Sequence, residues 1–209
     1  RSDVGPCGWV LTGHRATNDG GRGPLRRRAA GRGARGGRLQ KGRGGEERLR
    51  LALREEMHLL CGLCFICVNR QAPGVIRHQA LGLSNLGYHS GPPGSAAQVI
   101  AAEGAALFNA AGIDSQPMED VAQARWQKLV WNVPYNGLSV LLQASTRALM
   151  KDPASRALIR DLMDEVILGA QACGLVLPAD CADHLLRVTD QMPDYWPSMH
   201  HDHVHRRPL

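Results

Sequence analysis

The sequence predicts an α/β segment followed by an all-α domain, and three observations support this fold class. Apolar runs of strand length alternate with helical segments between residues 46 and 117. Beyond Met118, apolar positions recur at helical spacing. The first 50 residues resemble neither part: they hold 13 Lys and Arg against 4 Asp and Glu, a net of +9, and 13 of the 24 glycines. The remaining residues carry −3, so the chain's formal net charge of +6 belongs to this leading segment.

Residues 1–39 form a low-complexity Arg/Gly-rich segment without helical or strand periodicity, and we expect it to be disordered. Its tract from Arg26 to Arg38 could neutralise phosphates, which makes a basic nucleic-acid-binding arm one alternative function. Apart from Trp9 the segment has no aromatic residue to stack on bases, so a solvated tail is favoured. The spelling G-x-G-x-x-G occurs at residues 31–36, but it follows an arginine tract rather than a strand, and we interpret it as coincidence.

Residues 40–117 are predicted to form a partial α/β domain. In chain order we expect a helix over 46–53, a buried strand over 59–68, a turn at 71–74, short strands over 75–78 and 81–88, an Ala-rich helix and an extended piece over 113–117. Ser95 is predicted to cap the Ala-rich helix, and Gly112 to end it.

Residues 118–209 are predicted to be helical. A long helix spans 119–142 with an interruption at Pro134, and the Asp152-Pro153 pair begins a helix that Gly174 ends. Further helices are expected over about 179–192 and after Pro197.

Several classes are excluded by length and composition. The longest apolar run, residues 59–68, is about half the ~20 residues of a membrane helix. No basic stretch leads into an apolar core near Arg1, so no signal peptide is expected. Six cysteines in 209 residues are too sparse for a disulfide scaffold. We therefore expect a protein of the reducing cytoplasm.

Two patterns have the spacing of metal ligands, and we predict no metal at either. Cys61, Cys64 and Cys67 lack the fourth cysteine of an iron–sulfur run, and on a strand they alternate between faces, which favours small buried hydrophobes. The histidines at positions 200, 201, 203 and 205 are interpreted as incidental surface residues rather than ligands.

Lys128, Asn132 and Asn136 carry the strongest chemical signal. Their four-residue spacing places them along one helix face, among apolar neighbours. A cation and two amides facing a cleft could hold a polar ligand, and a lysine that loses hydration there can donate a proton near neutrality. A solvated helix face is the alternative that spacing alone favours.

Four ordered stretches resemble the ketopantoate reductase (2-dehydropantoate 2-reductase) family. Residues 126–136 resemble the W-x-K-L-x-x-N-x-x-x-N signature, residues 40–47 its Q-N-G-x-G-N-E-E loop, residues 63–78 its mid-sheet hairpin, and residues 198–202 its S-M-x-x-D segment. The resemblance covers roughly residues 39–209. It implies a partial Rossmann-type sheet followed by a helical domain of the 6-phosphogluconate dehydrogenase C-terminal-like type.

The resemblance implies NADPH-dependent reduction of 2-dehydropantoate, a small 2-oxo acid, to pantoate for pantothenate and coenzyme A synthesis. Lys128 would be the general acid, which typically contributes about 10²–10⁴-fold in rate. Asn132, Asn136 and Ser198 would hold the hydroxyl and carboxylate groups of the substrate.

The sequence departs from the family pattern at three places. The family's phosphate-binding G-x-G-x-x-G turn is absent after a strand, Lys41 stands where the family has an asparagine near the cofactor, and the chain ends before the glutamate of the family's R-P-x-E. We therefore expect impaired reduction. A non-catalytic helical interaction or dimerisation module, able to form a homodimer, is the alternative.

Overall fold

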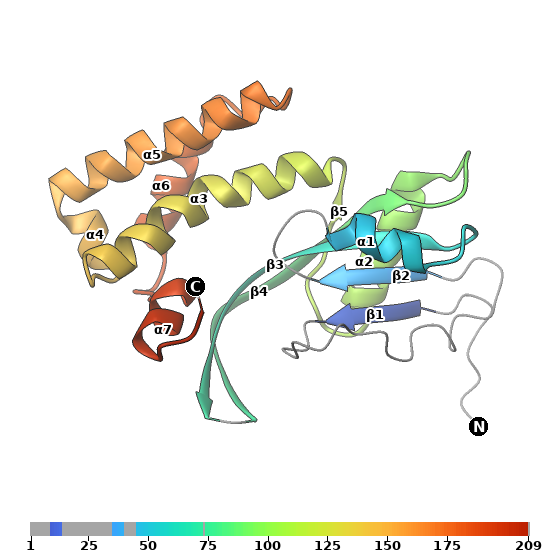
Figure 1. Ribbon diagram of the computed structural model, residues 1–209, viewed down its shortest axis with the longest axis horizontal. Coiled ribbons are helices and arrows are strands. Elements are labelled where there is room, and N and C mark those ends of the chain that lie inside the picture. The colour runs from blue at the N-terminus through green and yellow to red at the C-terminus, as the bar shows by residue number, and fades with distance from the viewer. Residues whose placement is uncertain (1–8, 14–34, 40–44, 73, 209) are drawn as a thin grey trace. The chain divides into compact units, whose positions relative to one another are not determined.

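The computed structural model describes residues 9–13, 35–39, 45–72 and 74–208. The chain divides into two compact units: Arg1–Ile66 with Leu81–Val121, and Cys67–Ala80 with Ala122–Leu209. The first contains most of the sheet, and the second contains the long helices (Figure 1). Within the described residues no helix combines the length and apolarity needed to cross a membrane.

The sheet has five strands in the order β1-β2-β3-β4-β5. They are β1 (Trp9–Gly13), β2 (Arg35–Leu39), β3 (His58–Ala72), β4 (Val75–Ser90) and β5 (Pro117–Met118). β2 pairs in parallel with both β1 and β3, and β5 pairs in parallel with β4. Helix α1 (Gly45–Ala52) connects β2 to β3, which makes a β-α-β unit. The predicted α/β segment is thus confirmed.

Two strands lie where the sequence predicts disorder, and for these ten residues that prediction is wrong. β1 and β2 both fall inside residues 1–39. β2 has the sequence Arg-Gly-Gly-Arg-Leu, which shows no apolar alternation. It is a strand because its backbone pairs on both sides, with β1 and β3, and such pairing between distant segments leaves no local periodicity. The rest of segment 1–39 and most of its arginine tract lie outside the described residues.

β4 replaces the two short strands predicted over 75–78 and 81–88, so the predicted break between them is wrong. The strand runs without interruption over 16 residues. Leu81 within it has φ 63°, a left-handed conformation that is rare for a branched side chain, and the pairing nevertheless continues beyond it.

Helix α2 (Ala97–Ala110) ends as predicted and begins differently. Gly112 has φ +78°, and the N–H of Ile113 donates to the carbonyl of Phe108, a left-handed glycine ending of the Schellman type. The predicted Ser95 cap is wrong, because the hydroxyl of Ser95 donates to the carbonyl of Pro92 and Ala96 occupies the N-cap position. The buried core beside α2 consists of Leu60, Leu86, Ile100 and Phe108, with Tyr88 packed against it.

Helix α3 (Val121–Leu141) is continuous through Pro134, so the predicted interruption is wrong. Proline removes one backbone donor from a helix, a cost that tertiary packing can offset. Pro134 is among the fully buried side chains, and Val130, Tyr135 and Leu138 are buried on the same helix. Burial of this apolar face stabilises the helix on both sides of the proline.

Four more helices complete the helical unit. They are α4 (Thr146–Lys151), α5 (Pro153–Ala172), α6 (Cys181–Gln191) and α7 (Ser198–Val204). Asp152 caps α5 by accepting the N–H of Ser155 at 2.8 Å, and Gly174 follows its end with φ +78°, both as predicted. Helix α4, capped by Ser145, is too short to show a period and was not predicted. The buried core of this unit comprises Val130, Tyr135, Leu138, Leu149, Met150, Ile159, Met163, Ala170, Leu177, Cys181, Ala182 and Leu186.

Candidate functional site

Helix α3 carries Lys128, Asn132 and Asn136, and its continuity gives their spacing a geometric meaning. Steps of four residues turn about 400°, so the three side chains follow one flank with about 40° of drift per step. All three are partly exposed, and they lie between the buried stripe of α3 and the exposed side that carries Val133. They therefore form one polar flank at the edge of the packed surface of the helix.

Contacts of neighbouring aromatic residues fix the rotation of α3 about its axis. The Nε1 of Trp131 donates to the Oγ1 of Thr189 at 2.9 Å, and the Trp131 ring stacks on Tyr135 with centroids 4.7 Å apart. The hydroxyl of Tyr135 lies 3.0 Å from the Sδ of Met150, and burial raises the pKa of this hydroxyl to about 12. Because α3 is held on this side by α6 and α4, the flank of Lys128 and Asn132 has a defined orientation.

Ser139 is a buried polar residue beside this flank that the sequence analysis did not single out. It lies three residues after Asn136, so it is offset from it by about 60° around the helix, toward the buried stripe. Its side chain is fully buried, and its hydroxyl donates to the carbonyl of Asn136 at 2.9 Å. The same helical period that singles out Asn132 and Asn136 could have found it.

Ser198 is the first residue of α7 and follows the buried Pro197. The ring of Tyr195, three residues earlier, lies 6.5 Å from the ring of Trp131, which directly precedes Asn132. The structure therefore brings the chain leading into Ser198 against the helix that carries the other three predicted residues. Lys41, the fifth predicted residue, lies outside the described residues.

The histidines near Ser198 differ in their burial. His200 is 9% exposed, and its ring packs on the ring of Trp196 with centroids 4.1 Å apart, whereas His203 and His205 are exposed. His200 therefore differs from the predicted surface histidine. Cys61 and Cys67 are buried, as predicted for small hydrophobes, whereas Cys64 is partly exposed and differs from that prediction. Across the described part of the chain, no three His, Cys, Asp or Glu side chains are placed to hold a metal ion.

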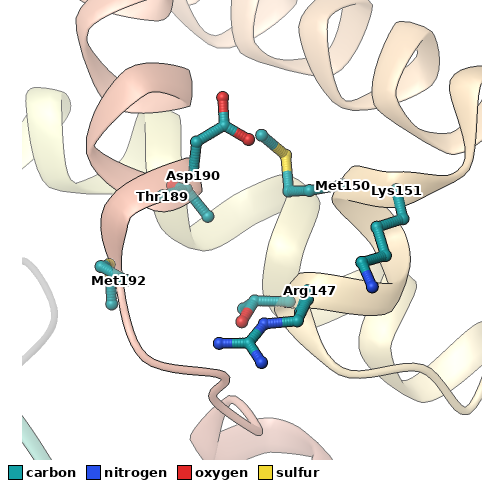
Figure 2. Close-up of a pocket in the computed structure, with 7 residues that line it drawn as sticks. Arg147, Met150, Lys151, Thr189, Asp190 and Met192 are labelled. Carbon is teal, nitrogen blue, oxygen red and sulfur yellow. The ribbon is translucent and has the colours of Figure 1, made fainter.

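A cavity of about 230 Å³ lies between α4 and the end of α6 (Figure 2). It is lined by Thr146, Arg147, Met150, Lys151, Thr189, Asp190 and Met192. Asp190 at its edge forms a two-point ion pair with Arg156, with both N–O distances at 2.8 Å. None of Lys128, Asn132, Asn136 and Ser198 lines this cavity, so it is separate from the predicted site.

The fold and helix α3 together define the class of protein. It has an α/β unit with parallel strands, followed by a helical unit that presents a lysine and two amides. Residues 37–91 match the family described as Ketopantoate reductase PanE/ApbA, and residues 120–209 match Ketopantoate reductase PanE/ApbA C terminal. The chain belongs to the ketopantoate reductase family.

Individual proteins agree with this assignment. The chain is 40% identical over 172 residues to a 2-dehydropantoate 2-reductase of Nostoc sp., an alignment that covers 82% of this chain and 54% of the relative. Two crystal structures of 2-dehydropantoate 2-reductases have TM-scores of 0.74. The one from Geobacter metallireducens is 39% identical, and the match covers 85% of this chain and 58% of that one. The one from Methylococcus capsulatus is 32% identical, and the match covers 98% of this chain and 63% of that one. The chain thus spans about half to two-thirds of the length of these relatives.

Proposed function

We propose that this chain serves the NADPH-dependent reduction of 2-dehydropantoate to pantoate. The observation that carries the proposal is the polar flank of α3, where Lys128, Asn132 and Asn136 follow one another on a single uninterrupted helix. Family membership supplies the reaction. The structure supports it through side chains of suitable chemistry on a helix whose rotation is fixed.

Lys128 is proposed as the general acid. In the reduction of a ketone, the carbonyl carbon gains a hydride and the oxygen gains a proton. The ammonium group of Lys128 would donate that proton and stabilise the negative charge that develops on the oxygen. Asn132, Asn136 and Ser198 would hold the hydroxyl and carboxylate groups of the substrate in the reacting geometry.

NADPH would supply the hydride, but helix α1 does not fit its pyrophosphate. A phosphate site of this kind uses a helix N-terminus with free N–H groups. The first turn of α1, the helix that follows β2, instead contains Glu46 and Glu47, whose carboxylates repel phosphate. The contribution we assign to the described residues is therefore the acid and the substrate contacts, and we expect weak turnover.

The test separates binding from turnover. Calorimetric titration of the 209-residue chain with 2-dehydropantoate should detect binding, and Asn132→Ala or Asn136→Ala should weaken it by about tenfold each. Lys128→Gln should lower any NADPH oxidation by about 10²–10⁴-fold. Lys151→Gln, on an exposed lysine of α4, is the matched control and should change neither measurement. A chain that does not bind 2-dehydropantoate would contradict the proposal.

A further inference from the structure

The connection between α6 and α7, residues 192–197, contains no helix or strand of its own. Its course determines where α7 begins, and therefore where Ser198 lies. A segment without internal backbone pairing takes its geometry from the contacts that hold it. The contacts of this connection are concentrated at two consecutive residues, Asp194 and Tyr195.

Tyr195 is held by its backbone on both sides. Its N–H donates to the Oγ1 of Thr146 at 3.1 Å, and its carbonyl accepts the N–H of Thr146 at 3.0 Å. Thr146 is the first residue of α4 and is only 2% exposed. One buried threonine thus supplies both a donor and an acceptor to the connection.

Asp194 adds two bonds to the same helix start. Its Oδ2 accepts the hydroxyl of Ser145 at 3.0 Å, and its Oδ1 accepts the N–H of Arg147 at 3.1 Å. Partial burial alone would raise the pKa of the Asp194 carboxyl, but these bonds, together with the charge of Arg147 and the backbone N–H of Tyr195, outweigh burial and hold the pKa below its ordinary value. The carboxylate therefore remains charged, as a partner of the first turn of α4.

The four hydrogen bonds form what we name the α4 clamp: residues 145–147 on one side, and Asp194 with Tyr195 on the other. Beyond the clamp, the Tyr195 ring reaches Trp131 on α3, and the ring of Trp196 packs on His200 of α7. Ser198 follows Tyr195 by three residues. The clamp is the hydrogen-bonded anchor of the chain directly before the predicted substrate contact.

We propose that Thr146 and Asp194 are positioning residues, which hold α7 so that Ser198 can contact the substrate carried by α3. This inference rests on the proposed function for its link to substrate. In this role neither residue contacts the substrate. Their effect passes through the connection, so they act on substrate affinity and on the order of α7.

Hydrogen exchange of the full chain, followed by peptide mass spectrometry, tests the positioning directly. Thr146→Val keeps the shape of the side chain and removes the acceptor of the Tyr195 N–H. We expect exchange in residues 199–204 to accelerate by about tenfold, with exchange in α5 as the unchanged internal reference. Thr146→Ser restores the hydroxyl and should return exchange to the parent rate. Asp194→Ala should loosen α7 in the same way.

Calorimetric titration with 2-dehydropantoate tests the link to the substrate. Thr146→Val and Asp194→Ala should each lower the affinity by about tenfold, and Thr146→Ser should restore it. Lys151→Gln is the matched control, because Lys151 is an exposed residue of the same helix that lies outside the clamp, and this variant should match the parent chain.

The outcomes separate the inference from the proposed function. Unchanged exchange in α7 of Thr146→Val and Asp194→Ala would overturn the positioning role. Faster exchange with unchanged affinity would overturn the link to Ser198. If the parent chain does not bind 2-dehydropantoate, the proposed function fails and with it this link, while the exchange of α7 still decides whether the clamp holds that helix.

Discussion

The indole of Trp131 donates a 2.9 Å hydrogen bond to the hydroxyl of Thr189, which joins α3 to α6. Thr189 is 6% exposed, and its hydroxyl in turn donates to the carbonyl of Leu185 at 2.7 Å. The same indole stacks on Tyr135 and reaches Tyr195. One side chain therefore contacts the buried face of α3, helix α6 and the connection to α7.

Replacing Thr189 with valine should destabilise the helical unit by about 1–3 kcal/mol. The substitution keeps the shape and leaves the Trp131 N–H without its acceptor, and an unsatisfied donor in a largely buried place costs this amount. Urea unfolding followed by tryptophan fluorescence measures the change. Thr189→Ser retains the acceptor and should lower the free energy of unfolding much less. Equal losses in the two variants would show that the hydrogen bond is not the cause.

Two residues of similar size on α5 should respond differently to replacement by alanine. Ile159 is 0% exposed within the core of the helical unit, whereas Leu168 is 62% exposed. Ile159→Ala should cost about 2–5 kcal/mol of unfolding free energy, because it removes buried methyl groups and leaves a cavity. Leu168→Ala should cost less than about 0.5 kcal/mol. Comparable values in chemical denaturation would contradict the placement of α5.

Two glycines should respond to alanine with opposite signs. A Cβ on Gly169, within α5, would meet the Trp126 ring at 3.5 and 3.6 Å, which is ordinary contact. Gly169→Ala should therefore stabilise the chain by about 0.5–1 kcal/mol through helix propensity. A Cβ on Gly87, in β4, would overlap the Cγ2 of Val121, so Gly87→Ala should destabilise by about 1–3 kcal/mol. Thermal unfolding of both variants checks the two signs.

The stability of the chain should fall as the pH drops below about 6.5, in part because of His200. Burial, together with His201 and His203, lowers the pKa of His200 from its model-peptide value of 6.5. The unfolded chain therefore binds a proton at His200 more readily than the folded chain does, so acid favours unfolding. The contribution of His200 to stability is complete only above the pKa that this histidine has in the unfolded chain. The pKa of His201 is also lowered, chiefly by burial, and adds to the effect.

His200→Leu measures that contribution. The leucine keeps an apolar contact for Trp196 and cannot be protonated, so the loss of unfolding free energy between pH 7.5 and pH 5.5 should become smaller. His184→Gln changes an exposed histidine of α6 and serves as the control. An unaltered pH dependence in His200→Leu would show that the buried ring is not the acid-sensitive group.

Local signals predicted most of the helices because each has its own sequence signature. Asp152 and Gly174 bound α5 as expected, since an N-cap carboxylate and a left-handed glycine act within one turn of the chain. Pro134 misled the prediction because its burial depends on neighbouring helices. β2 was missed for a related reason: its pairing partners lie 26 and 23 residues away, as in Trp9↔Arg35 and Arg35↔His58.

The candidate site divides in the same way. The sequence by itself determined the family, the helical period of Lys128, Asn132 and Asn136, and the presence of Ser198 near the end, because motif and spacing are properties of neighbouring residues. The tertiary structure decided what holds these residues: Trp131 on Thr189, and Thr146 and Asp194 around the connection to α7. Those contacts join residues up to 58 positions apart, and no local pattern records a pairing that forms only when the chain is packed.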